Sequence, residues 1–158
     1  MKLIKNIVFT ILTIIIIFAG IKIHEGYEMY KNAINEISIE QMLKKIKENP
    51  DYTVYKDLPQ DYINAVIAVE DRRFFIHNGI DIISISRAVF IDIKERELKE
   101  GGSTITQQLA KNTYFTQDRK LTRKIAEIFM AFEYEKNLSK EEIFELYVNT
   151  SYFGDGYY

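Results

Sequence analysis

The sequence predicts a mainly α-helical protein, and three observations favour this fold class. Apolar side chains recur three and four residues apart in the segments after residue 58, which is the spacing of one face of an α-helix. Glycine occurs 7 times and proline only 2 times in 158 residues, which is few for the tight turns of a β-sandwich. One N-terminal stretch stays apolar over about 20 residues, the length of a helix that crosses a bilayer.

Length and composition exclude several kinds of protein. A chain of 158 residues has room for one domain rather than two, and its net charge of −2 gives no positive field that would predict nucleic-acid binding. Without cysteine, the chain has no disulfide, catalytic thiolate or cysteine-based metal site, and its 2 histidines are too few for a three-histidine zinc site. It also lacks the glycine motifs that bind phosphates and dinucleotides, so we expect no organic cofactor.

The N-terminal apolar stretch predicts a membrane anchor. Residues 7–21 carry no charge, and the apolar run extends from Leu3 to Ile23. A cleaved signal peptide is one alternative, but the run is long and no clean small-residue cleavage site follows it. A buried core helix is the other, but four consecutive isoleucines leave no polar face. Because Lys2 and Lys5 precede the uncharged residues 7–21, we expect a single-pass helix with a cytoplasmic N-terminus and an extracytoplasmic remainder.

The chain divides into three predicted parts. Residues 1–24 are a cytoplasmic stub and the anchor, residues 25–57 a membrane-proximal helical linker, and residues 58–158 the main domain. In the linker, apolar residues at roughly helical spacing alternate with lysine and glutamate, which indicates one or two amphipathic helices. The Asn-Pro-Asp sequence at 49–51 ends them, and an extended stretch is expected at residues 52–55.

A helix is expected to begin at Pro59, because proline at a first helical position loses no hydrogen bond. Ile63, Val66 and Ile67 form an apolar stripe, and Glu70 falls seven residues after Ile63 on that stripe. A carboxylate on a buried face either has a charged partner or takes a proton more readily than usual. Two arginines follow directly at 72 and 73, so an ion-paired helix end and a general base both remain open.

A second polar feature follows the glycine-containing loop at residues 100–104. Thr104 and Gln107 have the spacing of a capping box, which marks a helix N-terminus. One face of this helix carries Thr104, Gln107, Gln108 and Lys111. It could be a solvated face, but such faces usually carry glutamate and lysine. Two amides, a hydroxyl and a cation suit a sugar or a phosphate, and a helix N-terminus favours an anion.

Two more helices are predicted near the C-terminal end. The first spans about residues 121–136 and contains Arg123 and Glu127 four residues apart, which as a surface salt bridge would contribute little to stability. The second begins at Ser139, where Glu142 completes another capping box, and ends within residues 149–156.

Four motifs lie in one order along the chain. Residues 70–79 match E-D-x-x-F-x-x-H-x-G, and residues 101–112 match G-x-S-T-I-T-Q-Q-x-x-K-N. Residues 123–127 match R-K-x-x-E, and residues 140–149 form the fourth motif, with Tyr-Phe-Gly at 152–154. Together they resemble the peptidoglycan glycosyltransferase family, the lysozyme-like domain of monofunctional transglycosylases and class A penicillin-binding proteins.

The resemblance implies a lysozyme-like helical glycosyltransferase domain over residues 58–158, held at the bacterial cell membrane, that polymerises lipid II into glycan strands. The donor is a growing chain on a polyprenyl diphosphate, and the acceptor is the sugar 4-hydroxyl of lipid II. A diphosphate already leaves well, so the reaction needs a base and positive charge. The family domain continues past the fourth motif, so this sequence resembles such a domain with its C-terminal part missing.

The resemblance also assigns roles to residues. Glu70 is the general base, and Glu127 is a second essential glutamate that helps place the diphosphate or a metal ion. Mg²⁺ or Mn²⁺ is the expected metal, because hard cations prefer phosphate and carboxylate oxygens. The expected partners are lipid II, the lipid-linked glycan chain, the membrane and other cell-wall synthesis proteins. Substrate and diphosphate are expected to contact Arg87, Ser103, Thr104, Gln107, Lys111, Arg119 and Arg123.

This assignment carries a geometric expectation and leaves two alternatives. Glu70, Gln107, Lys111 and Glu127 should converge on one groove, because the base and the diphosphate cation act in the same reaction. A lysozyme-like lytic enzyme is one alternative, although basic residues spaced for a diphosphate argue against it. An inactive membrane protein that binds lipid II without turnover is the other, and the missing C-terminal part favours it.

Overall fold

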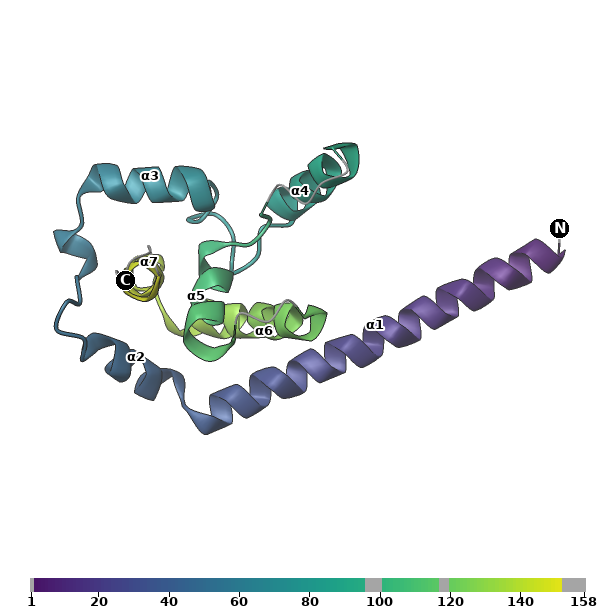
Figure 1. Ribbon diagram of the computed structural model, residues 1–158, viewed down its shortest axis with the longest axis horizontal. Coiled ribbons are helices and arrows are strands. Elements are labelled where there is room, and N and C mark those ends of the chain that lie inside the picture. Colours follow the sequence, from purple (N-terminus) through teal and green to yellow (C-terminus); the bar gives the residue numbers. More distant parts are fainter. Residues whose placement is uncertain (1, 96–100, 117–119, 152–158) are drawn as a thin grey trace.

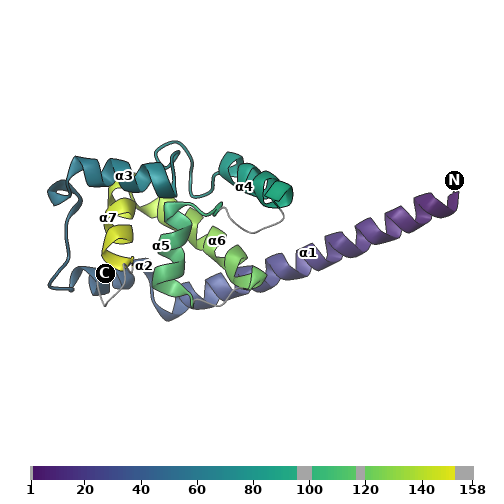
Figure 2. The ribbon, with the colours of Figure 1, turned by 45° about the horizontal axis from the view of Figure 1, so that its top comes forward.

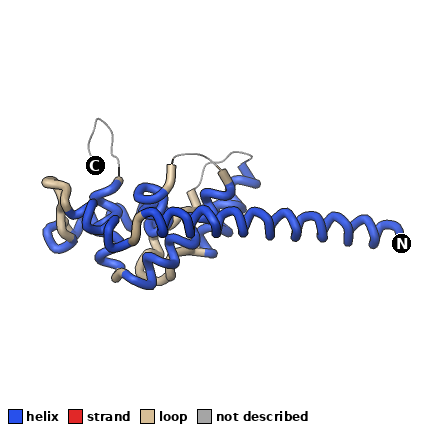
Figure 3. Tube along the Cα trace, turned by 90° about the horizontal axis from the view of Figure 1, so that it is seen from below, coloured by secondary structure: helices blue, strands red, loops and turns tan. Residues whose placement is uncertain are grey.

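The structure, a computed structural model, describes residues 2–95, 101–116 and 120–151, and in these ranges it contains helices and loops but no strand (Figures 1 and 3). The predicted mainly α fold is therefore confirmed. The helices are α1 (Lys2–Glu36), α2 (Ile39–Lys47), α3 (Gln60–Glu70), α4 (Ile82–Glu95), α5 (Ile105–Tyr114), α6 (Leu121–Asn137) and α7 (Lys140–Thr150), with a short 3-10 turn at Tyr55–Asp57.

Helix α1 is one long rod whose N-terminal part projects away from the other helices (Figure 1). Residues 3–21 are all exposed, and they include isoleucines such as Ile16 that show 70% of their surface. By length and composition this helix can cross a membrane. The same helix continues without a break past His24 to Glu36, so its end does not mark the predicted domain boundary at residue 24. The predicted division of the chain at residues 24 and 57 stays a prediction.

The C-terminal half of α1 packs against α6. The two helix backbones approach closely at one point, and aromatic rings pack between the helices farther along. Gly26 is buried against Ile125, and Phe129 contacts the rings of Tyr27 and Tyr30. The part of the chain predicted as a linker therefore contains the C-terminal part of α1, docked on the body, then α2, which Ser38 begins with a capping box, and then the 3-10 turn.

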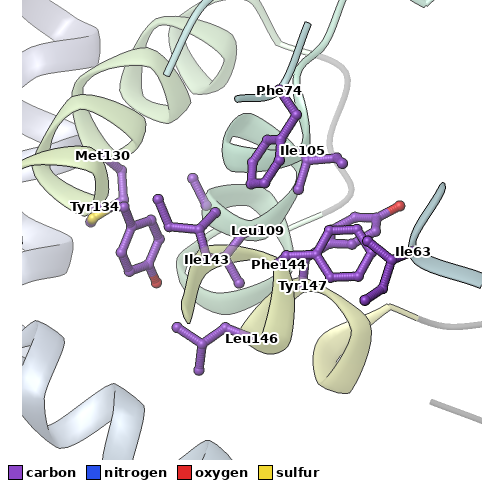
Figure 4. Close-up of a cluster of buried hydrophobic side chains, with 11 residues drawn as sticks. Ile63, Phe74, Ile105, Leu109, Met130, Tyr134, Ile143, Phe144, Leu146 and Tyr147 are labelled. Atoms are coloured by element: carbon purple, nitrogen blue, oxygen red, sulfur yellow. The ribbon is translucent and has the colours of Figure 1, made fainter. Parts of the chain in front are cut away.

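Helix α5 is the centre of the body and packs against both α6 and α7 (Figure 2). The two capping boxes predicted at Thr104 and Ser139 are both present and begin α5 and α7. The core lies among α3, α5, α6 and α7 and buries aromatic and aliphatic side chains of these helices and of the loop after α3 (Figure 4). Its buried members are Ile63, Phe74, Ile105, Leu109, Ala110, Met130, Tyr134, Ile143, Phe144, Leu146 and Tyr147.

Helix α4 is an element that the sequence analysis did not assign. Asp81 lies just before it, and its carboxylate accepts hydrogen bonds from the backbone N–H groups of Ile83 and Ser84 at 2.9 and 3.2 Å. These bonds satisfy amides of the first turn that have no partner inside the helix. Arg73 lies 3.1 Å from the same carboxylate and so ties the start of α4 to the loop after α3.

Candidate functional site

The loop that follows α3 holds the N-terminus of α5. Asp71 is buried, and its Oδ2 accepts a hydrogen bond from the backbone N–H of Ile105 at 3.0 Å. The same carboxylate lies 2.8 Å from Nε2 of the buried His77. The Thr104 hydroxyl donates to the carbonyl of Gly79 at 2.6 Å, and Gly79 has a φ of 91°, a conformation that favours glycine. These hydrogen bonds thus connect the first motif, residues 70–79, to the second, residues 101–112.

Two predicted binding residues, Thr104 and Gln107, form the cap itself. The Thr104 hydroxyl accepts from the Gln107 backbone N–H at 3.1 Å, and Gln107 Oε1 accepts from the Thr104 backbone N–H at 3.0 Å. Their exposed fractions are only 2% and 1%. These two side chains therefore fix the start of α5, and their predicted contact with substrate stays a prediction.

A cavity of about 360 Å³ lies between α5 and α6. We call it the cationic cavity, because three of its side chains, Lys111, Arg123 and Lys124, are cations and one, Glu127, is a carboxylate. A surplus of positive charge in a concave site attracts anions, and lysine and arginine both bind phosphate oxygens. Its other lining residues are Ser103, Gln107 and Gln108.

Glu127 is the buried centre of this arrangement, with 1% of its surface exposed. Its Oε1 is paired with Arg123, and its Oε2 lies 3.0 Å from Nζ of Lys124. Lys124 also donates to the Ser103 hydroxyl at 2.6 Å. Arg123 and Glu127 pair as their spacing indicates, but the interpretation of this pair as a surface salt bridge is wrong, because Glu127 is buried and Lys124 is a second partner.

This donor set bears on the expected metal ion. Both oxygens of Glu127 are already contacted by cations, and among the described residues Glu127 is the one carboxylate that lines the cationic cavity. Among the described residues no group of three or more His, Asp or Glu side chains is arranged to hold a metal ion. The described side chains alone do not complete a metal site, but Mg²⁺ is commonly held by one or two carboxylates together with substrate phosphates. The expected Mg²⁺ or Mn²⁺ at Glu127 therefore stays a prediction.

Glu70 lies in an adjoining cavity of about 230 Å³ that shares Ser103 with the cationic cavity. The four residues expected in one groove thus divide between two neighbouring cavities, with Gln107, Lys111 and Glu127 in one and Glu70 in the other. Arg87 lines the same cavity as Glu70. Arg119, the remaining predicted binding residue, lies outside the described residues.

The surroundings of Glu70 differ from the expectation. Its side chain is exposed rather than buried, because only the first turns of α3 face the core and the neighbouring Val69 is 81% exposed. The arginines that follow contact other groups: Arg72 donates to the carbonyl of Ala68 at 3.1 Å, and Arg73 pairs with Asp81. Of the two interpretations that the sequence leaves open for Glu70, pairing with a neighbouring arginine is therefore wrong among the contacts described.

Gln108 connects the two cavities. The sequence places it on a polar face suited to a sugar or a phosphate, but does not indicate a contact with Glu70. Its Nε2 donates to Oε2 of Glu70 at 2.8 Å, while its side chain also lines the cationic cavity. On its other side, the Tyr147 hydroxyl lies 3.5 Å from Gln108 Oε1. Burial, together with the negative charge of Glu70, raises the pKa of Tyr147 to about 12.

A third cavity, of about 710 Å³, separates the C-terminal half of α1 from the junction of α5 and α6. Arg123 lines both this cavity and the cationic cavity. The site therefore lies beside the helix that continues from the apolar N-terminal segment.

The fold and the site together define a class of protein: a helical domain in which a carboxylate lies beside a cluster of cations. The family model described as Transglycosylase matches residues 36–158. The chain belongs to this transglycosylase family. The family assignment made from the four motifs is therefore confirmed.

Individual relatives agree with this assignment. The chain is 43% identical over 116 residues to a monofunctional glycosyltransferase of Staphylococcus epidermidis, covering 73% of this chain and 43% of the relative. It is 41% identical over 116 residues to the Staphylococcus aureus protein of the same name, with the same coverage. It is 39% identical over 146 residues to penicillin-binding protein 1F of Bacillus subtilis, covering 90% of this chain and 20% of the relative. The chain spans half or less of the length of the curated relatives that it matches.

Proposed function

We propose that the protein is a peptidoglycan glycosyltransferase that polymerises lipid II at the outer face of the cell membrane. The observation that carries the proposal is that Glu70, in the adjoining cavity, accepts a hydrogen bond from Gln108, which also lines the cationic cavity. A reaction that joins a sugar hydroxyl to a sugar diphosphate needs a base and an anion-binding site side by side. The family and the relatives named glycosyltransferase support the same reaction.

In the proposed step, the Glu70 carboxylate takes the proton of the acceptor 4-hydroxyl. The oxygen then forms a bond to the anomeric carbon of the donor sugar, while the bond from that carbon to the phosphate oxygen breaks. The electron pair of the broken bond leaves with the polyprenyl diphosphate. Lys111, Arg123 and Lys124 stabilise the negative charge that grows on this leaving group, as preorganised cations do in a site partly shielded from water.

Glu127 has a supporting part in this proposal. Its carboxylate holds Arg123 and Lys124 at the cavity, so that two flexible cations are already in place before the diphosphate arrives. Preorganised charge costs little reorganisation during the reaction. The apolar part of α1 would keep the site at the bilayer, where both lipid-linked substrates reside, with its N-terminus cytoplasmic.

The proposal is tested with the full chain in vesicles that contain labelled lipid II. We expect glycan polymer from the unmodified protein, and loss of both substrate affinity and rate in Lys111→Ala, because a cation on a diphosphate acts before and during bond cleavage. Lys56→Ala changes an exposed lysine that lines neither cavity of the site and is the matched control. Cleavage of finished glycan without polymerisation would identify a lytic enzyme instead, and lipid II binding without turnover would identify a binding protein.

A further inference from the structure

The contact between α1 and α6 is closer than side chains normally permit. A Cβ atom added at Gly26 would lie 2.5 Å from Cγ2 of Ile125 and 3.0 Å from the carbonyl oxygen of Thr122. Real Cβ atoms essentially never approach another heavy atom to 2.5 Å. Any other residue at this position would therefore have to push the two helices apart. Gly20, on the same helix, has open space around it.

Contacts on both sides of Gly26 fix the register of the two helices. The Thr122 hydroxyl donates to Glu25 at 3.1 Å, and the ring of Tyr27 meets Phe129 edge-on with centroids 5.3 Å apart. Farther along, the Tyr30 hydroxyl donates to Glu133 at 3.3 Å. Rising residue numbers on α1 meet rising numbers on α6, so the two helices run in the same direction (Figures 1 and 2).

This register places the start of α6 next to the end of the apolar segment of α1. The apolar run ends at Ile23, and Gly26 follows three residues later, which is about 4.5 Å along a helix that rises 1.5 Å per residue. On α6, the cationic residues Arg123 and Lys124 directly precede Ile125, the residue that contacts Gly26. If α1 crosses the bilayer, the cationic cavity therefore lies close to the headgroup layer.

We propose that Gly26 is a positioning residue that sets the height of the cationic cavity above the membrane. The diphosphate of a polyprenyl-linked substrate is held at the headgroup layer by its hydrocarbon chain, so the cations that receive it must lie at the same level. Close docking at Gly26 makes the anchor and α6 one rigid unit at that level. This inference rests on the proposed function for the identity of the ligand, while the height itself is measured without turnover.

The absence of cysteine makes a direct measurement available. Leu121→Cys and Lys136→Cys, at the two ends of α6 and 58% and 75% exposed, each accept one fluorescent label in the full chain. The label depth in vesicles is measured by quenching with phospholipids brominated at different positions along their acyl chains. We expect stronger quenching at residue 121 than at residue 136, because the near end of α6 lies beside the membrane.

Gly26→Leu is the test variant, and Gly20→Leu is the matched control because it adds the same side chain to the same helix in open space. We expect Gly26→Leu to lose most of the quenching at residue 121, and Gly20→Leu to keep it. Gly26→Ala, which adds only the clashing Cβ, should give an intermediate loss and is used where the leucine variant does not fold. Circular dichroism confirms that each variant keeps its helix content.

Unchanged quenching in folded Gly26→Leu and Gly26→Ala would overturn the inference. Turnover supplies a second readout: both Gly26 variants should polymerise lipid II poorly in vesicles but normally in detergent micelles, where no fixed headgroup plane exists. Equal loss in both media would show a merely structural role and would also overturn the inference. Altered depth together with no turnover by any form of the protein would contradict the proposed function and leave the docking geometry in place.

Discussion

Gln108 Nε2 donates a hydrogen bond to Glu70 Oε2 across 2.8 Å, and this contact joins α5 to the end of α3. The two residues are 38 positions apart and belong to different motifs. Gln108 also lines the cationic cavity, so it orients the proposed base towards the place where the proposed leaving group binds.

Replacing Gln108 by leucine should lower kcat about tenfold, because a hydrogen bond to a charged group contributes on the order of 1.5–3 kcal/mol and here it also orients the carboxylate. The measurement is the initial rate of lipid II polymerisation at saturating substrate. Gln60→Leu is the matched control, because Gln60 is exposed and bonds only to Asn64 one turn along the same helix among the contacts described. A Gln108→Leu rate equal to that of the control would show that this contact has no part in turnover.

Asp71→Ala should destabilise the protein by about 3 kcal/mol. The change removes the acceptor for the backbone N–H of Ile105 and leaves that group and His77 buried without their partner. Asp71→Asn keeps one acceptor oxygen and should cost less. Denaturant unfolding in detergent, followed by circular dichroism, measures both. If Asp71→Ala unfolds at the same denaturant concentration as the exposed-site control Asp57→Asn, Asp71 does not hold the start of α5.

The carboxylate of Asp81 should make stability depend on pH in the acid range. Burial acts to raise the pKa of Asp81, but hydrogen bonds from Ser84 and Ile83 and the charge of Arg73 outweigh it, so the pKa lies below its usual value of 3.8. Since folding lowers this pKa, the ionised form stabilises the fold above pH 3.8, and the contribution is lost as the pH falls towards the folded-state value.

The corresponding variant is Asp81→Asn, which has no proton to gain. At pH 5 and at pH 6, its melting temperature should lie below that of the unmodified protein by about the same amount. Below about pH 4, this difference between the two melting temperatures should shrink. Asp57→Asn, at an exposed position, should show no such pH-dependent difference. A gap that stays constant down to pH 3 would mean that the charge of Asp81 does not stabilise α4.

The helices that could be predicted from sequence are those whose ends carry explicit signals. Thr104 with Gln107 and Ser139 with Glu142 satisfy backbone groups locally, so their capping boxes required no knowledge of the rest of the fold. Residues 82–95 gave no comparable assignment, because isoleucine and serine alternate at 83–86, a pattern that fits a strand as well as a helix. The structure shows a helix there, begun by Asp81.

The surroundings of the site could not be predicted, because they depend on contacts between distant segments. The apolar stripe on α3 indicated a buried Glu70, but the core ends before the last turn of that helix and leaves the carboxylate exposed. The spacing of Arg123 and Glu127 was visible in the sequence, but the burial of Glu127 follows from the packing of α5 on α6. The spacing of residues along the sequence indicates which side chains can pair on one helix. Whether such a pair is buried depends on the neighbouring helix, which the spacing does not show.

The central claim is that Glu70 is the base of lipid II polymerisation, and Glu70→Gln tests it most directly. Glutamine keeps the shape and hydrogen-bonding capacity of the side chain but removes its basicity, and general base catalysis contributes on the order of 10²–10⁴-fold in rate. We expect glycan polymer from the unmodified protein and from Glu48→Gln, an exposed-site control, and none from Glu70→Gln, with lipid II affinity unchanged in all three. Polymerisation by Glu70→Gln at the unmodified rate, or a loss of lipid II binding equal to the loss of rate, would contradict the claim.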